Sequence, residues 1–274
     1  IGLPNATSVA SDWNTATPSP IDNFDEHDNV YDTLISAKKI TSSDVLRVIR
    51  KITWTTGTIY EMYRPDYSIN KLSPQTNSSS LYKANFYVMN SDFRVYECIY
   101  NGASPSNSGA GVISLEEPTH TDLQPRLESD GYIWKYLYTI KPSDIIKFDS
   151  AEFIPVPANW STNPDVSDVR NAAVDGKIET IVIEDVTNAT YQFSGTKNAV
   201  PIRGDGSDGL ASVTFINGKP SAVQVTNGGS GYSFGTLDLD DVVTGSGASF
   251  SVIVPPPGGH GADIYRELGA NKVL

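Results

Sequence analysis

The stretch that decides the fold is Asp130-Gly131-Tyr132-Ile133-Trp134-Lys135-Tyr136-Leu137-Tyr138-Thr139-Ile140. Because side chains alternate across a β-strand, a strand here places four aromatic rings and Ile140 on one face. The Asp-Gly pair at its start is a turn signal. An aromatic side chain buries about 150–250 Å², so this face has to lie against other protein. The stretch predicts a central core strand, with a platform for stacking sugars or bases as the alternative.

The composition around this strand is typical of a mainly β protein. The 274 residues include 22 Gly, 17 Pro and 14 Tyr, and 39% of the chain is hydrophobic. This length suffices for a sizeable core and for two folding units. The formal net charge of −12 argues against binding to nucleic acid or to an anionic membrane, because phosphates attract a basic surface. No run approaches the roughly 20 apolar residues of a membrane helix.

The single cysteine and the two ends of the chain also limit the possibilities. Cys98 alone excludes an internal disulfide framework and fits a reducing compartment, and its strand-like surroundings predict a buried thiol. The chain begins with Ile1 and has no signal-peptide pattern before it. Its last residues, 271–274, look like the start of a strand. We therefore expect a chain that is incomplete at both ends.

The order of turn signals and apolar runs predicts the elements of the main domain. Residues 1–24 are expected to form an irregular arm whose Trp13 docks on the body, and Asp25 to Ala37 a helix. Further on we expect a hairpin, a short helical turn and an edge run with prolines. The predicted ranges are strands at 45–54 and 58–63, a polar loop at 64–80, the hairpin 83–89 with 93–100, a flexible loop at 101–111, the helical turn after 141 and the edge run 153–157.

Residues 175–254 differ in composition from the rest of the chain, because they are rich in glycine and contain an internal repeat. Each copy has a Gly-Lys start, a Thr-Asn pair, a Tyr, a Phe, a Gly-Thr pair and an Ala-Ser strand start. The matching positions are Gly176 with Gly218, Thr187 with Thr226, Tyr191 with Tyr232, Phe193 with Phe234, Gly195 with Gly235, and Ala211 with Ala248. We predict a small β module of two related halves, with Asn217-Gly218 as a hairpin turn at their junction.

Together these patterns predict a mainly β fold in three ranges. Residues 1–174 form an antiparallel β-sandwich-type main domain with a short helix and an N-terminal arm. Residues 175–254 form the inserted Gly-rich module, and residues 255–274 return to the main domain after the Pro-Pro-Pro-Gly-Gly run.

The candidate binding motifs are weak. Gly204-Asp205-Gly206-Ser207-Asp208-Gly209 matches G-x-G-x-x-G by letters, but Leu210 to Ile216 reads as a strand, whereas the dinucleotide fingerprint needs a helix there. Asp205, Asp208 and nearby carbonyls are an alternative calcium site, although the EF-hand spacing is absent. The turn interpretation is preferred for both.

The candidate catalytic residues are weak as well. His27, His120 and His260 are widely spaced, with no zinc motif and no G-x-S-x-G elbow near them. Glu128 and Asp130, beside the aromatic strand, are the best carboxylate pair for glycosidase chemistry. Neither is singled out by its surroundings. We therefore expect no enzyme activity, and no catalytic, cofactor-binding or metal-binding residues.

The aromatic strand, together with Phe93-Arg94-Val95-Tyr96-Glu97-Cys98-Ile99, resembles the baseplate wedge protein family of T-even-type contractile-tailed bacteriophages known as gene product 8. The match covers roughly residues 1–160 and 255–274, and it is looser outside the aromatic motif. Ile1-Gly2 followed by Trp13 resembles the stretch after that family's N-terminal segment, and residues 37–44 and 257–261 look like marine, cyanophage-like members. The Gly-rich module departs from the founding member and looks like an insertion, and its Thr226 to Tyr232 run resembles small β repeats of phage structural proteins.

The resemblance implies a structural subunit of a tail baseplate wedge. Such a subunit is made in the host cytoplasm, ends in the virion, packs among other wedge subunits around the tail tube, and can form a homodimer. No catalytic residue carries over. Loops 64–80 and 101–111 and the arm 1–24 are candidates for docking. The alternatives are a carbohydrate- or receptor-binding tail module and a baseplate glycosidase or esterase.

Overall fold

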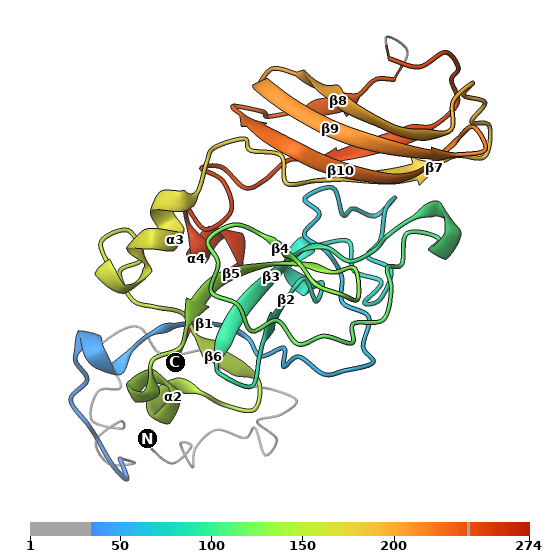
Figure 1. The fold of residues 1–274 in the computed structure, drawn as a ribbon. Coiled ribbons are helices and arrows are strands. Elements are labelled where there is room, and N and C mark those ends of the chain that lie inside the picture. Colours follow the sequence, from blue (N-terminus) through green and yellow to red (C-terminus); the bar gives the residue numbers. More distant parts are fainter. Residues whose placement is uncertain (1–33, 240–241) are drawn as a thin grey trace. The chain divides into compact units, whose positions relative to one another are not determined.

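The computed structural model describes residues 34–239 and 242–274 (Figure 1). The chain divides into two compact units, residues 1–45 and 46–274. In the first unit, a short 3-10 helix η1 (Ser42–Asp44) is fixed by Thr41, whose backbone N–H and hydroxyl both donate to the Asp44 carboxylate. Trp13 lies outside the described residues, as does most of the predicted helix 25–37. The described end of that range, 34–37, is not helical.

The second unit is built on an antiparallel sheet in the order β2-β3-β5-β4, in which Figure 1 shows β3 and β5 side by side. Its strands are β2 (Tyr87–Met89), β3 (Arg94–Tyr100), β4 (Arg126–Leu127) and β5 (Ile133–Thr139). The predicted hairpin of 83–89 with 93–100 is confirmed. Asn90 fixes its turn, since its side-chain oxygen accepts hydrogen bonds from the backbone N–H groups of Asp92 and Arg94.

The prediction of one continuous aromatic face on β5 is wrong, because the strand contains a bulge. Val95 pairs with Tyr138, and the next residue of β3, Tyr96, pairs with Tyr136, which leaves Leu137 as an extra residue in β5. Neighbouring residues of β3 point to opposite faces, so Tyr136 and Tyr138 do as well. A period of two read from the sequence cannot show such an insertion.

The aromatic rings of β5 are nevertheless part of the core on both faces. The rings of Tyr132 and Trp134 stack with centroids 5.3 Å apart, and Tyr60 packs edge-on against Trp134. Tyr138 packs edge-on against Trp160 on the other side. Tyr132, Trp134 and Tyr138 are all buried, which confirms the core strand and excludes these rings as an open stacking platform.

A second antiparallel sheet brings the end of the chain back to the main part. It has the order β13-β1-β6, with β1 (Arg47–Arg50), β6 (Phe153–Pro155) and β13 (Lys272–Val273). The predicted edge run 153–157 and the strand start at the end of the sequence are confirmed. Within the predicted range 45–54, the strand itself covers β1 only.

The predicted strand at 58–63 is wrong. This segment has one isolated bridge, between Thr58 and Ser114, and three of its backbone N–H groups donate to separate partners. The N–H of Tyr60 donates to the Tyr132 hydroxyl, and the N–H of Tyr63 donates to the Cys98 carbonyl. Local β propensity is overridden here because tertiary contacts satisfy the backbone without a ladder.

The helices of the second unit are short. The predicted helical turn after residue 141 is confirmed as α2, which starts with Pro142 at a position that tolerates proline. The helices are η2 (Leu81–Lys83), η3 (Pro105–Asn107), α2 (Pro142–Phe148), η4 (Pro164–Val166), α3 (Ser167–Ala172) and α4 (Ile264–Glu267).

The Gly-rich module consists of long antiparallel strands, shown in orange in Figure 1. One sheet has the order β10-β9-β8-β11, and β12 pairs with β7. The predicted hairpin turn is confirmed, since Asn217 and Gly218 join β9 to β10 with φ of 50° and 77°, as a type I′ turn requires. The strands are β7 (Thr180–Asp185), β8 (Gly195–Gly204), β9 (Ser207–Ile216), β10 (Lys219–Ser230), β11 (Gly235–Leu237) and β12 (Ser249–Ile253).

The two related halves of the module exchange strands with each other. The first half supplies β7, β8 and β9, and the second supplies β10, β11 and β12. The first strand of each half pairs with the third strand of the other, and the two middle strands pair together. The turns match too: the Tyr191 N–H donates to the Gly218 carbonyl over 3.0 Å, and the Tyr232 N–H donates to the Gly176 carbonyl over 3.3 Å. The duplication seen in the sequence is therefore also a structural one.

The described residues of the second unit bury apolar side chains in two clusters. The larger cluster surrounds β3 and β5, and the other lies inside the module. Strand β7 serves both, because Val182 belongs to the first cluster and its neighbour Ile181 to the second. Residues 46–274 thus form one compact unit, and the domain ranges 1–174, 175–254 and 255–274 remain a sequence-based prediction.

Polar contacts join the same parts of the unit. Glu184 at the end of β7 accepts a hydrogen bond of 2.7 Å from Arg64 and one of 2.9 Å from Lys71. Burial alone would raise the pKa of Glu184, but hydrogen bonds from Ser251, Arg64 and Lys71 outweigh it and lower the pKa to about 2. The ionised carboxylate is the form that this network stabilises.

Gly176→Ala is expected to destabilise the protein more than Gly57→Ala does. Both glycines have positive φ, but a Cβ at Gly176 would lie 2.1 Å from the Tyr232 nitrogen, while a Cβ at Gly57 would meet nothing within 4 Å. Gly57→Ala therefore carries only the backbone strain of about 1–2 kcal/mol, and Gly176→Ala adds about 1–3 kcal/mol of overpacking. Urea unfolding measures both, and equal losses would contradict the close approach of the two halves.

Glu184→Gln is expected to lower stability at pH 7 by about 0.5–1 kcal/mol, because the pair with Arg64 is partly exposed. The folded pKa lies below the ordinary value of 4.5. The stabilisation is therefore present above that value, and it is lost as the pH falls towards about 2. Urea unfolding from pH 7 down to pH 2.5 should show the difference between wild type and variant disappearing. The control is Glu152→Gln at an exposed position, and a difference that persists in acid would contradict this account.

Candidate functional site

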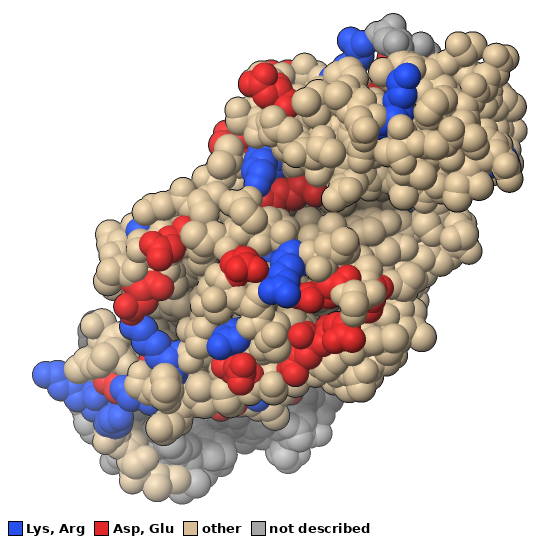
Figure 2. Space-filling model, viewed as in Figure 1, with Lys and Arg blue, Asp and Glu red and all other residues tan. Residues whose placement is uncertain are grey.

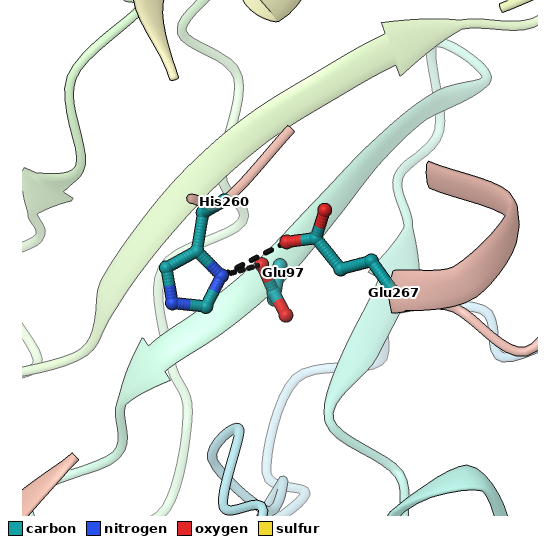
Figure 3. A group of neighbouring side chains, drawn as sticks. All are labelled: Glu97, His260 and Glu267. Atoms are coloured by element: carbon teal, nitrogen blue, oxygen red, sulfur yellow. Dashed lines mark hydrogen bonds and ion pairs between the residues drawn. The ribbon is translucent and has the colours of Figure 1, made fainter. Parts of the chain in front are cut away.

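Three buried ionisable side chains meet inside the second unit: Glu97 on β3, His260 in the segment before α4, and Glu267 at the end of α4 (Figure 3). The Nδ1 atom of His260 lies 2.8 Å from Glu97 Oε2 and 2.9 Å from Glu267 Oε1. Buried charges are expensive unless they are paired, so a cluster of this kind is unusual in a protein interior.

The local sequence explains how His260 and Glu267 come together. Asp263 caps α4 by accepting hydrogen bonds from the N–H groups of Tyr265 and Arg266, and the single turn that follows ends at Glu267. The Gly261 N–H then donates to Glu267 Oε2 over 2.8 Å. The chain turns sharply before this point, because Gly259 has a φ of 91° and a Cβ there would lie 2.3 Å from the Val174 carbonyl oxygen.

Burial and neighbouring charges together determine the protonation of the three side chains. The His260 ring lies edge-on to Tyr63, with centroids 4.8 Å apart. Burial would lower the pKa of His260, but Glu97 and Glu267 raise it to about 10. Burial, and then the charge of Glu267, raise the pKa of Glu97 well above its usual range. Burial would raise the pKa of Glu267, but the hydrogen bond and charge of His260, together with hydrogen bonds from Glu97 and the Gly261 N–H, outweigh it and lower the pKa. An ion pair of His260 with Glu267 beside a protonated Glu97 is the state that these effects favour.

The cluster lies beneath the protein surface. A surface hollow of about 360 Å³ is lined by Tyr63, Tyr82 and Glu267 among others, yet the side chains of Glu97 and Glu267 have no exposed surface. A glycosidase needs two carboxylates on either side of a substrate bond. Here the two carboxylates share one imidazole instead.

The predicted carboxylate candidates Glu128 and Asp130 lie elsewhere, and Asp130 has a structural role. Its carboxylate accepts hydrogen bonds from the Ser114 hydroxyl and from the backbone N–H groups of Leu115, Glu116 and Tyr132. Asp130 thus fixes the loop before β4 against the start of β5. Glu128 lies 3.9 Å from Nε2 of the buried His120 and 3.8 Å from Nε of Arg126. Burial raises the pKa of Glu128, with Arg126 opposing it.

The alternatives for the Gly204–Gly209 stretch are resolved by its place between β8 and β9. A strand follows it, so the dinucleotide interpretation is wrong. Asp205 accepts hydrogen bonds from the Ser233 N–H, the Ser233 hydroxyl and the Phe234 N–H, which lower its pKa to about 2. Within residues 34–239 and 242–274, the group of side chains able to hold a metal is the Glu97 cluster, which contains neither Asp205 nor Asp208. The calcium alternative is therefore not supported.

The three histidines are widely spaced in the sequence, but the fold brings His260 to two carboxylates. His27 lies outside the described residues, and His120 contacts acidic groups only at 3.9 Å or more. The cluster was missed because Glu97 and His260 are far apart in the sequence. One signal could have found it: Glu97 is an acidic residue in the middle of a strand whose neighbours Tyr96 and Cys98 are apolar or aromatic.

Fold and cluster together define a mainly antiparallel β protein with a buried carboxylate–imidazole cluster. A scan against protein-family models found no match to this chain, and neither did searches of curated proteins and of solved structures. In the part of the chain that the structure describes, none of the helices has the length and apolar character needed to cross a bilayer.

Asp130→Ala is expected to lower the free energy of unfolding by about 1–3 kcal/mol, because its backbone partners lose their acceptor. Hydrogen exchange of the Leu115 and Glu116 amides should accelerate before global unfolding does. Asp122→Ala, at an exposed position, is the matched control and should leave both amides unchanged. Unaltered exchange in Asp130→Ala would refute the loop-fixing role, and a loss of measurable glycoside hydrolysis would restore a catalytic one.

Proposed function

We propose that this chain is a structural subunit of a phage tail baseplate wedge. It assembles with other wedge subunits around the tail tube, and it catalyses no reaction. The resemblance of the aromatic strand and of the preceding strand supports the family. The observation that carries the proposal is the burial of Tyr132, Trp134 and Tyr138 inside the core. These rings stiffen the subunit and offer no groove to a substrate or a sugar.

Exposed apolar side chains on the loops support a role in assembly. Ile69 and Leu72 lie in the loop 64–80, which is one of the candidate docking segments, and they are 83% and 47% exposed. Ile113 and Leu115 follow the loop 101–111 and are exposed as well. Single exposed apolar residues are common, but several on long loops suit surfaces that become buried when subunits associate.

The distribution of charge supports the same role. On the face shown in Figure 2, charged side chains form small groups within a mostly uncharged surface, and few lie over strands β8–β10. The centres of protein interfaces are depleted of charged residues, because a charge that loses its water without gaining a partner is costly. The net charge of −12 disfavours nucleic acid as the partner.

A second candidate function is carbohydrate or receptor binding by the module. The observation that favours it is the ring of Phe234, which is 60% exposed beside the turn that contains Tyr232. An exposed aromatic ring can stack on a sugar face. A glycan array with the full chain separates the two candidates, since saturable binding to one sugar class supports the second.

Ile69→Asp is expected to weaken association with the neighbouring wedge subunits at least tenfold. It should change the free energy of unfolding by no more than about 0.5 kcal/mol, because the position is exposed. The measurement is co-purification and size-exclusion light scattering of the chain co-expressed with wedge subunits of the same phage.

Ile146→Asp is the matched control, because Ile146 on α2 is similarly exposed, at 87%, but lies outside the candidate docking loops. Equal effects of the two substitutions would contradict a docking role for loop 64–80. If the wild-type chain bound no wedge subunit, and antibodies against it failed to label the baseplates of intact tails, the structural assignment itself would fail.

A further inference from the structure

The Glu97–His260–Glu267 cluster has the composition of a metal site. It offers one imidazole nitrogen and two carboxylates, and the candidate ligand atoms all lie within 4.8 Å of one another. Histidine nitrogen with glutamate oxygen is a ligand set that Zn²⁺ uses in proteins. Ca²⁺ instead takes 6–8 oxygen ligands, and Mg²⁺ keeps most of its water. The donors therefore favour a transition-metal ion such as Zn²⁺.

An unpaired atom of Glu97 points to a ligand. The Glu97 side chain is completely buried; its Oε1 atom has no partner, and its Oε2 atom is ion-paired with His260 Nδ1 without making a hydrogen bond. The 2.8 Å approach of Oε2 to His260 Nδ1 lacks hydrogen-bond geometry, while Nδ1 does bond to Glu267 at 2.9 Å. Both carboxylates thus converge on one nitrogen, which in a neutral imidazole can present a lone pair to an ion (Figure 3). A buried polar atom without a partner is the kind of observation that an ion accounts for.

The charges are compatible with a bound ion. Without it, the His260–Glu267 ion pair beside a protonated Glu97 has no net charge. When a divalent cation binds, Glu97 and His260 each give up a proton, and the cation balances the charge of −2 on the two carboxylates and the neutral imidazole.

Neighbouring groups orient the side chains of Glu267 and His260, as they do for the ligands of metal sites. The Gly261 N–H fixes Glu267 Oε2, and the Tyr63 ring fixes the plane of His260. Contacts of this kind orient the ligands of known metal sites. Two of these residues, Tyr63 and Glu267, also line the surface hollow of about 360 Å³.

We propose that Glu97, His260 and Glu267 bind one Zn²⁺ ion, which fastens the segment 255–274 to strand β3. Because the ligands are enclosed and come from β3, from the segment before α4 and from α4 itself, the ion has a structural role. It goes beyond the proposed wedge function and does not depend on it. A subunit that is not in a wedge would bind the ion equally well.

The test uses the full chain, stripped with EDTA and titrated with ZnCl₂ by calorimetry. The expected result is one Zn²⁺ per chain with a submicromolar Kd, and a rise in Tm of about 5–10 °C once free Zn²⁺ exceeds Kd a hundredfold. X-ray absorption at the zinc edge of the wild-type complex should show one imidazole and otherwise oxygen ligands. Absence of binding at 100 µM ZnCl₂, or a spectrum with two or more imidazoles, would overturn the proposal.

The variants separate this cluster from other sites on the chain. Glu267→Gln and Glu97→Gln keep the side-chain volume and are expected to weaken Zn²⁺ binding about 100-fold or more, because each removes an anionic ligand. His120→Gln removes the other described histidine and should leave Kd and stoichiometry unchanged. If both glutamine variants bind Zn²⁺ as wild type does, the cluster is held by protons alone and the proposal is wrong. Should a variant not fold, the absorption measurement on the wild-type chain decides.

Discussion

The pairing of β3 with β5 is the constraint on which the rest of the second unit depends. It places Cys98 opposite Trp134 and Glu97 opposite Lys135, so that one ladder carries both the buried Trp134 ring and the buried carboxyl group of Glu97. The bulge at Leu137 turns Tyr138 to the opposite face from Tyr136, which lets a single strand fill the core on both sides. Residues far away in the sequence, including Tyr60 and Trp160, then complete the packing.

The Gly-rich module is stabilised differently, because the strands of each duplicated half pair with strands of the other half. Neither half has a complete set of partners for its own strands, because β7 needs β12 and β10 needs β9. The exchange makes the halves dependent on each other, and the glycines at the contact points allow the backbones to approach closely. Strand β7 faces both hydrophobic clusters, and Glu184 at its end pairs with Arg64. The module is therefore joined to the rest of the unit by packing as well as by charge.

The polar interior has a common character. Asp130 fixes a loop, Asp205 fixes a turn of the module, and the Glu97 cluster connects β3 to α4. In each case ionisable groups hold backbone segments together. In some proteins a buried ionic group contributes to the choice of one structure. The Glu97 cluster has the donor set to do this with a metal ion.

The sequence by itself determined the elements whose signals are local. The alternation of apolar and polar side chains predicted β5 and the hairpin of β2 with β3. Pro142 marked the start of α2, and Asn217-Gly218 marked a turn. The internal repeat within residues 175–254 indicated a module of two related halves. The β-rich fold class follows from such signals, because propensity and turn chemistry act over a few residues.

Only the tertiary structure decided what depends on contacts between distant segments. It placed Leu137 in a bulge, replaced the predicted strand at 58–63 by scattered hydrogen bonds, and exchanged strands between the halves of the module. It also brought His260 to Glu97. No sequence period encodes these outcomes, because each minimises the free energy of burying backbone and charge against partners that the chain reaches only after it has folded.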